Sequence, residues 1–286
     1  MTLAALTRAS GTFVMVAMDQ RESLRTMLAD NGHNADDARM ARFKVAVARE
    51  LAPYASGFLI DRHYAFQEVS QLMPPTCGLI LAVDTLVQEP GGVVEDTSLD
   101  EGADVAAAKE AGAVALKLLV IWRDDDRRAE RLELARSFVA LAAKHDLLSV
   151  LEPVVRVAEV DREDAIVEAA RELGALRPSL YKCQVPLYGR GDPEEIRQRA
   201  RAIDAALASP WVVLSQGVEP DDFPGAVEAS CKGGASGMLA GRAVWTATLP
   251  ADDPIELLRT ESVPRLQELA AIVDEHGRPW TEAVAS

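Results

Sequence analysis

The chain has 286 residues, of which 49% are hydrophobic, and no apolar run reaches the roughly 18 residues that a membrane span needs. Its formal net charge of −15 argues against a surface that binds nucleic acid or an anionic membrane. The start of the chain lacks the pattern of a signal peptide, and Cys77, Cys183 and Cys231 are spaced too widely for a zinc site. We therefore expect reduced thiols and a cytoplasmic protein that has no nucleic-acid or membrane partner.

Short apolar runs alternate with longer charged segments, a pattern typical of repeated βα units around a parallel sheet. The expected strands are, in chain order, 13–19, 57–62, 78–84, 113–120, 147–155, a short strand around Lys182, 211–217 and 235–241. The expected helices are 21–31, 36–51, 104–111, 126–145, 161–174, 193–207, 221–233 and 263–276. The alternation predicts an α/β fold, a single-domain (β/α)₈ TIM barrel over residues 1–286, ending in an amphipathic helix and a loose tail after Gly277.

The long segment 85–99 contains Pro90-Gly91-Gly92, and its length is typical of a lid or binding loop. A doubly wound open sheet is the alternative fold. It is disfavoured because the first expected strand ends in Asp19-Gln20-Arg21-Glu22, where that fold would carry a glycine-rich phosphate loop.

Polar residues lie near the carboxyl ends of the expected strands, where a barrel carries its active site. They are Asp19, Asp61, Asp84, Lys117, Glu152, Lys182, Gln184, Ser215 and Arg242. Asp19, Lys117, Glu152 and Lys182 belong to four different apolar strands. Their placement favours a catalytic cluster over the alternative, a set of structural ion pairs at the barrel mouth.

Lys182 is the expected nucleophile. Leu180, Lys182 and Gln184 share one face of the strand by the two-residue period. A lysine held among apolar neighbours loses affinity for its proton, and a second cation at Lys117 would add to that effect, so the neutral amine can attack a carbonyl. The alternative is a lysine that reaches water or pairs with a carboxylate.

The two carboxylates of this cluster have complementary expected roles. Glu152 can move protons while a carbinolamine dehydrates to an imine, and it can also serve carbon–carbon cleavage. Asp19 can accept hydrogen bonds from substrate hydroxyls or hold Lys182 in place.

The last two expected strands end in Ser215-Gln216-Gly217 and Ala240-Gly241-Arg242. Small residues there let backbone N–H groups approach an oxyanion, and Arg242 adds a fork of donors at the usual phosphate site of this fold. The alternatives are simple turn geometry for the glycines and a surface salt bridge for Arg242. Further candidates for substrate contact are Asp61, Tyr64, Gln184 and Gln216.

The chain resembles the class I (Schiff-base) aldolases that include tagatose-bisphosphate aldolase and, more closely, sulfofructosephosphate aldolase. The resemblance covers nearly the whole chain and rests on LTRASGTFVMVAMDQRESLR, KLLVIWR, LLSVLEPVVR, LYKCQVPLYGRGD, WVVLSQGV and GASGMLAGRAVW. It implies an imine between Lys182 and the dihydroxyacetone phosphate portion of a ketose phosphate, with help from Glu152 and Lys117. It also implies that no metal or other cofactor takes part, that Asp19 and Gln20 contact the sugar, and that the anion pockets contain Ser215, Gly217, Gly241 and Arg242.

Two stretches depart from the family pattern. Cys183-Gln184-Val185-Pro186 stands where the sulfosugar enzyme has Val-Glu-Met-Pro, and Ser215-Gln216-Gly217 stands where Ser-Ser-Gly is typical. Both stretches lie near the expected site. They leave open whether the second anionic group of the substrate is a sulfonate or a phosphate.

We expect a lyase that cleaves 6-deoxy-6-sulfofructose 1-phosphate, a ketohexose 1-phosphate, into dihydroxyacetone phosphate and the three-carbon aldehyde sulfolactaldehyde. The alternative substrate is a tagatose or fructose bisphosphate. Two other functions remain open, namely a phosphosugar isomerase or epimerase with Glu152 as its base and a non-catalytic sugar-phosphate binding protein. An acidic exterior and an additional amphipathic helix predict a homo-oligomer.

Overall fold

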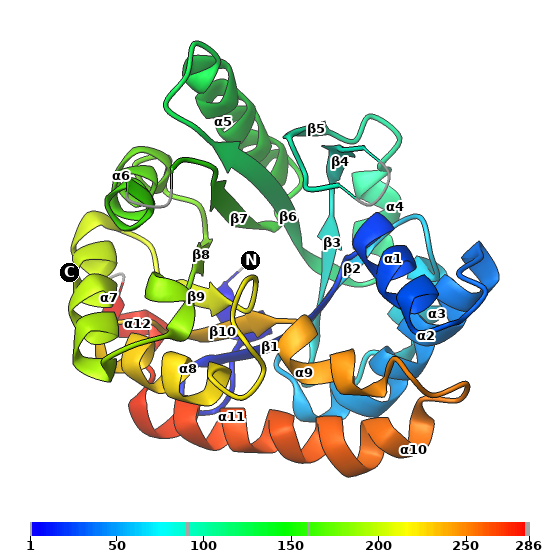
Figure 1. Cartoon of the computed structure of the whole chain (residues 1–286). Coiled ribbons are helices and arrows are strands. Elements are labelled where there is room, and N and C mark those ends of the chain that lie inside the picture. Colours follow the sequence, from blue (N-terminus) through cyan, green and yellow to red (C-terminus); the bar gives the residue numbers. More distant parts are fainter. Residues whose placement is uncertain (1, 90–91, 159–160, 284–286) are drawn as a thin grey trace.

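The structure is a computed structural model that describes residues 2–89, 92–158 and 161–283. Eight parallel strands close into a barrel in the order β1-β10-β9-β8-β7-β6-β3-β2, and helices surround it (Figure 1). The barrel strands are β1 (Phe13–Met18), β2 (Gly57–Asp61), β3 (Gly78–Ala82), β6 (Ala113–Trp122), β7 (Leu148–Val155), β8 (Leu180–Gln184), β9 (Trp211–Leu214) and β10 (Gly237–Ala240). The predicted (β/α)₈ fold is confirmed.

The described helices fill the connections between the strands and run along the outside of the barrel (Figure 1). They are α1 (Glu22–Asp30), α2 (Asp37–Leu51), α3 (Phe66–Leu72), α4 (Val105–Glu110), α5 (Arg128–Lys144), α6 (Arg162–Gly174), α7 (Pro193–Ala206), α8 (Phe223–Lys232), α9 (Arg242–Trp245), α10 (Ile255–Leu257), α11 (Val263–His276) and α12 (Trp280–Ala283). The sequence pattern did not predict α3. That helix begins after Ala65, which has a left-handed backbone and provides no side-chain cap, so the usual start signal is missing.

Alternation along the strands divides the apolar residues into two sets. Inward-facing side chains such as Met15, Val150 and Leu180 fill the barrel, and Leu3 and Leu6 of the 3₁₀-helix η1 (Leu3–Leu6) pack with them. The outward-facing side chains pack against the surrounding helices. The apolar filling ends near the carboxyl ends of the strands, where polar residues follow in the same inward-facing rows.

Residues 84–99 form a hairpin rather than the loop that was expected there. Strand β4 (Asp84–Val87) pairs antiparallel with β5 (Asp96–Leu99), so that Asp84 lies opposite Leu99. Pro90 and Gly91 of the predicted loop lie outside the described residues. Thr85, Val87 and Thr97 suit the extended arms of the hairpin.

Residues 278–283 are docked against the barrel, so the expectation of a loose tail after Gly277 is wrong for them, while residues 284–286 lie outside the described residues. The backbone N–H of Arg278 donates to the Ala235 carbonyl, and that of Trp280 donates to the Gly11 carbonyl, each over 3.0 Å. The Arg278 guanidinium pairs with Asp204 at 3.2 Å. Trp280 also packs against the apolar filling of the barrel, and burial of this ring holds the segment in place.

The cysteines are free and buried, and burial raises the pKa of each thiol to about 12. Cys183 is next to Lys182 in the chain, but it points outward into the packing against the helices. Among the described helices, none combines the length and the apolar character needed to cross a membrane.

Gly237 gives a direct test of the seam between β1 and β10. It has a φ of +139°, and a Cβ there would overlap the carbonyl oxygen of Phe13. We expect Gly237→Ala to lower the free energy of unfolding by about 3 kcal/mol, measured by urea denaturation. The control is Gly225→Ala in α8, where a Cβ meets nothing within 4 Å and stability should hold or rise slightly. Equal stability of the two variants would contradict this close approach.

Candidate active site

A cavity of about 220 Å³ opens at the carboxyl ends of the barrel strands. It is lined by residues of, or directly after, β1, β4, β6, β7, β8, β9 and β10, and by the tip of the β4–β5 hairpin. Lys117, Glu152 and Lys182 reach it because they continue inward-facing rows on their strands. The structure therefore brings together the cluster that the sequence placed on separate strands.

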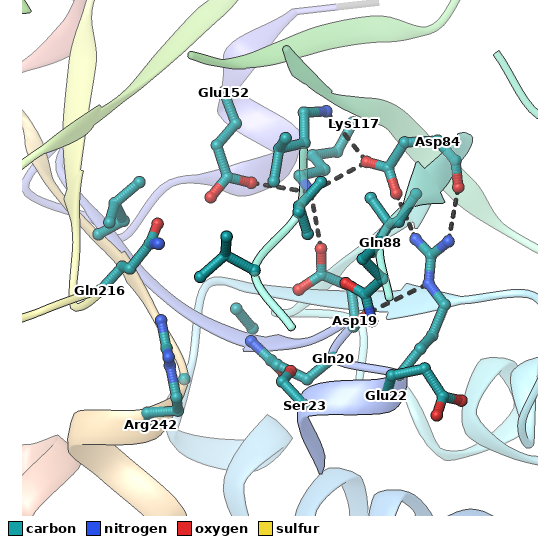
Figure 2. Close-up of a pocket in the computed structure, with 18 of the residues that line it drawn as sticks. Asp19, Gln20, Glu22, Ser23, Asp84, Gln88, Lys117, Glu152, Gln216 and Arg242 are labelled. Atoms are coloured by element: carbon teal, nitrogen blue, oxygen red, sulfur yellow. Dashed lines mark hydrogen bonds and ion pairs between the residues drawn. The ribbon is translucent and has the colours of Figure 1, made fainter. Parts of the chain in front are cut away.

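The ammonium of Lys117 lies among three carboxylates. Its Nζ is 2.8 Å from Asp19 Oδ2, 3.0 Å from Asp84 Oδ2 and 2.8 Å from Glu152 Oε2 (Figure 2). Burial alone lowers the pKa of Lys117, but the three carboxylates outweigh burial and raise this pKa well above its usual value. Lys117 is therefore a fixed positive charge.

Two of these carboxylates are held ionised. Burial alone raises the pKa of Asp19, but the charges of Lys117, Lys182 and Arg21 outweigh it and hold the pKa well below its usual range. Burial alone also raises the pKa of Asp84, but the charges of Lys117 and Arg21 outweigh burial and lower this pKa. The Arg21 guanidinium pairs with the Asp84 carboxylate and donates to the Asp84 backbone carbonyl over 2.6 Å. Both carboxylates can therefore accept hydrogen bonds at neutral pH.

Lys182 lies beside Glu152 at the floor of the cavity. Its side chain is 4% exposed, and its Nζ is 3.0 Å from Glu152 Oε2. The same oxygen is in contact with Lys117, so one carboxylate oxygen lies between two ammonium groups. The formal charges of this cluster balance, because it contains three cations and three carboxylates, namely Lys117, Lys182, Arg21, Asp19, Asp84 and Glu152.

Arg242 lies on the other side of the cavity from Asp84 and Gln88, next to Gln216 (Figure 2). Burial lowers the pKa of its guanidinium, which nevertheless stays charged at neutral pH. Ser215 and Gly241 line the cavity on the same side. Gly241 lies so close to the Ala17 carbonyl that a Cβ would overlap it. This side of the cavity therefore offers small residues and a positive charge to an anionic group.

Gln20 lines the cavity, but Asp61 and Tyr64 do not. Asp61 is buried outside the cavity, where it pairs with Lys44 and accepts the backbone N–H groups of His63, at 2.8 Å, and Tyr64, at 3.1 Å. The Tyr64 hydroxyl accepts a hydrogen bond from Arg25 over 2.9 Å. The structure thus places Asp61 and Tyr64 in contacts that support the protein behind the site.

Lys44 links this support to the cavity. Its ammonium donates to the carbonyls of Met18, at 2.9 Å, and Gln20, at 2.7 Å, which flank Asp19 in the chain. Burial lowers the pKa of Lys44, while the Asp61 carboxylate works against that shift. The pair therefore fixes the backbone on both sides of Asp19.

Gln184 and Gly217 also lie outside the cavity lining. The Gln184 side-chain oxygen accepts the backbone N–H of Val155 over 2.8 Å and so links the ends of β7 and β8. Gly217 has a φ of +77° and lies against the ring of Tyr188, where a Cβ would not fit. In this structure both residues maintain the shape of the strand ends.

Arg21, Arg156 and Gln88 line the cavity but have no role in the site that the sequence predicts. Arg21 and Arg156 follow Asp19 and Glu152 at even spacing, so the two-residue period could have placed them on the same faces. Gln88 reaches the cavity from the hairpin, a placement that no periodic pattern announces.

Comparisons with known proteins identify the family of the chain. Residues 13–247 match the model of the DeoC/LacD family aldolases. Tagatose 1,6-diphosphate aldolase 2 of Streptococcus pyogenes serotype M1 is 27% identical over 95% of this chain and 94% of its own. Tagatose 1,6-diphosphate aldolase of Listeria monocytogenes serotype 4a (strain HCC23) is 25% identical over 97% of this chain and 92% of its own.

Solved structures share the barrel. Fructose-bisphosphate aldolase from Plasmodium falciparum superposes with a TM-score of 0.73 at 13% identity, covering 96% of this chain and 93% of that one. A Schiff-base-forming fructose-1,6-bisphosphate aldolase superposes with a TM-score of 0.62 at 20% identity, covering 95% and 98%. The family match spans every strand of the barrel, and the protein therefore belongs to the DeoC/LacD family of aldolases.

Proposed function

We propose that the protein is a class I aldolase in which Lys182 forms a Schiff base with a ketohexose 1-phosphate. The observation that carries this proposal is the 3.0 Å contact between Lys182 Nζ and Glu152 Oε2 at the floor of the cavity. A buried amine with a carboxylate in proton-transfer range is the arrangement that imine chemistry needs. One of the fold neighbours is itself a Schiff-base-forming aldolase.

Each proton transfer in the proposed formation of the imine has a donor and an acceptor. Glu152 takes one proton from the Lys182 ammonium, and the amine attacks the C2 carbonyl carbon. The carbonyl oxygen then takes a proton from the attacking nitrogen, which gives a carbinolamine. Glu152 returns its proton to this hydroxyl, water leaves, and a protonated imine remains.

Carbon–carbon cleavage follows from the imine. The C3–C4 bond breaks, its electron pair moves toward the imine nitrogen, and the C4 hydroxyl loses its proton to the Glu152 carboxylate. An aldehyde leaves, and protonation of the enamine at C3 and hydrolysis release dihydroxyacetone phosphate and free Lys182. The ionised Asp19 accepts hydrogen bonds from sugar hydroxyls, and Gln20 contributes a further polar contact.

The identity of the substrate is proposed from the anionic groups that the cavity could bind. Arg242, Ser215 and Gly241 form a positively charged side of the cavity that suits the C1 phosphate. The names of the relatives favour a second phosphate, as in tagatose 1,6-bisphosphate. The sulfonated sugar, 6-deoxy-6-sulfofructose 1-phosphate, stays a prediction. We also propose a cytoplasmic homo-oligomer that works without a metal and without nucleic-acid or membrane partners, in line with its acidic composition.

Borohydride trapping tests the nucleophile. With dihydroxyacetone phosphate present, we expect reduction to leave one covalent adduct, which intact mass and peptide mapping place on Lys182. Lys182→Ala should form no adduct and lose turnover while its circular dichroism spectrum is unchanged. Lys117→Arg is the matched lysine control and should still be labelled at Lys182. Near-wild-type turnover in Lys182→Ala would end the proposal, and bound ligand without an adduct would favour the isomerase or the binding protein.

Glu152→Gln tests the proton carrier. The amide keeps the size of the side chain but cannot exchange a proton, so we expect kcat to fall by roughly 10²- to 10⁴-fold. The rate of borohydride trapping should fall with it, because dehydration of the carbinolamine becomes slow. The control is Glu130→Gln, which removes an exposed carboxylate paired with Arg127 on the outside of the barrel. Unchanged trapping in Glu152→Gln would assign the proton transfers to another group.

Lys117→Met tests the charge that keeps Asp19 ionised. In the wild type, the lowered pKa values of Asp19 and Asp84 contribute stability above the unfolded pKa of about 4, and this stability is lost as the pH falls toward the folded pKa. Without the ammonium, both folded pKa values rise and this contribution shrinks, because Lys182 and Arg21 are then the cations left to lower the pKa of Asp19, and Arg21 that of Asp84. We expect unfolding free energy to drop by about 3–5 kcal/mol at pH 7.

The difference in unfolding free energy between Lys117→Met and wild type should be smaller at pH 3 than at pH 7. At pH 3 the wild type itself loses part of the stability that comes from the lowered pKa values of Asp19 and Asp84. Urea denaturation at both pH values measures this. The control is Lys232→Met, which breaks an exposed pair with Glu228 and should change stability by no more than about 1 kcal/mol. A difference that is constant with pH would contradict the assigned charge coupling.

A further inference from the structure

Two arginines differ from the other arginines of the molecule in the partners of their side chains. In residues 2–89, 92–158 and 161–283, Arg156 and Arg242 are half-buried, and their guanidinium groups make no hydrogen bond or ion pair. Every other buried or half-buried arginine in those ranges donates to a carboxylate or a carbonyl. Both exceptions line the same cavity.

Arg156 follows β7 in the inward-facing row that starts at Leu148 and includes Glu152. Its backbone N–H extends the β6–β7 pairing by donating to the Trp122 carbonyl over 2.9 Å, which fixes its direction. The side-chain Nε is buried and has no partner. An unpaired buried donor on a charged group is costly, so its retention at the cavity calls for an anion that arrives from outside.

Among residues 2–89, 92–158 and 161–283, no carboxylate is left to pair with Arg156. Burial lowers the pKa of Arg156, and the nearest charges include Arg123 as well as Glu95. Glu95 is already paired with Arg123. The charge-balanced cluster around Lys117 leaves no spare carboxylate either, since Glu152 is shared between two lysines. Within the part of the chain that the structure describes, Arg156 and Arg242 therefore remain as positive charges without a carboxylate partner at the cavity.

The order of the strands separates these two charges. Around the barrel the order is β10, β9, β8, β7, so Lys182 on β8 lies between Arg242, which follows β10, and Arg156, which follows β7. A ketose joined to Lys182 at C2 has a short arm that carries the C1 phosphate and a long arm that carries C3 to C6. If the short arm points to Arg242, the long arm points toward β7.

We infer that Arg156 binds the oxyanion at the C6 end of the substrate and selects ketoses with two anionic ends over ketose 1-phosphates, an assignment that rests on the proposed aldolase function. The guanidinium fork can donate two parallel hydrogen bonds to a phosphate or to a sulfonate. Both groups have the required oxygens, so Arg156 demands an anion at C6 but does not by its charge distinguish the two kinds.

The test compares unreactive ligands, so that it does not depend on the imine. Hexitol 1-phosphate and hexitol 1,6-bisphosphate lack a carbonyl, and calorimetry gives their Kd values for the full-length protein. We expect wild type to prefer the bisphosphate, and Arg156→Met to reduce this preference by roughly 10- to 100-fold. Arg156→Lys should keep part of it, because an ammonium provides charge without the fork. In turnover, the same variants should lower the kcat/KM ratio of ketose 1,6-bisphosphate to ketose 1-phosphate.

The matched control is Arg123→Met, which removes the neighbouring arginine that Glu95 already neutralises. It should change the preference by less than about threefold. Arg156→Met should also unfold at the same temperature as wild type or higher, because it removes an uncompensated charge. An equal loss of affinity for both hexitols, an unchanged preference, or marked destabilisation would each overturn the assignment.

The hexitol that carries a 6-sulfonate and a 1-phosphate separates the two sources of the oxyanion. If its binding to wild type is tighter than that of the bisphosphate, and Arg156→Met removes this advantage, Arg156 serves a sulfonate. The reverse order assigns it to a phosphate. Failure of borohydride trapping with these preferences intact would reject the aldolase mechanism and keep the C6 anion site, so the two failures are distinguishable.

Discussion

The ammonium of Lys117 allows three carboxylates to share one end of the barrel. Without it, Asp19, Asp84 and Glu152 would face each other in a space from which water is largely excluded, where like charges repel strongly. With it, Asp19 and Asp84 stay ionised, and Glu152 lies within reach of Lys182. The proposed division of labour follows from this geometry, with one lysine as a fixed charge and the other as the nucleophile.

Behind the cavity, a set of hydrogen bonds holds the strand ends that carry these groups. The Lys44–Asp61 pair fixes the backbone around Asp19, and the Gln184 side chain links β7 to β8. Such buried pairs add little to stability relative to an apolar core. Their value here is positional, because the proposed proton transfer between Glu152 and Lys182 would be slowed by a displacement of about 1 Å.

The features that the sequence could predict share a physical basis. Strands buried on both faces must be nearly continuous apolar runs, so the sequence predicted their number and order along the chain. A charged residue within such a run is an exception to this pattern and could therefore be identified as a candidate site residue. The period of two then placed Lys117, Glu152 and Lys182 on the inward face.

Other features depend on contacts that no period encodes. Asp61 and Tyr64 follow a strand end and resemble site residues in sequence, but they have partners in the surrounding helices, Lys44 for Asp61 and Arg25 for Tyr64. The docking of Trp280 and the hairpin at β4 and β5 arise from tertiary packing and from strand pairing. Arg156 became significant only when its lack of a partner could be compared with the pairing of the other arginines.

The chain has a net charge of −15, yet its cavity contains two guanidinium groups, Arg156 and Arg242, for which the described residues provide no carboxylate partner. A sugar with two anionic ends is therefore repelled by the net charge of the protein at long range and attracted by the two guanidinium groups once it is inside the cavity. Dissolved salt screens charges beyond about 10 Å at 0.1 M, so it weakens the outer repulsion more than the contacts inside the cavity. Capture of substrate by this protein should consequently become faster as ionic strength rises, the opposite of the behaviour of enzymes whose surface field draws the substrate in.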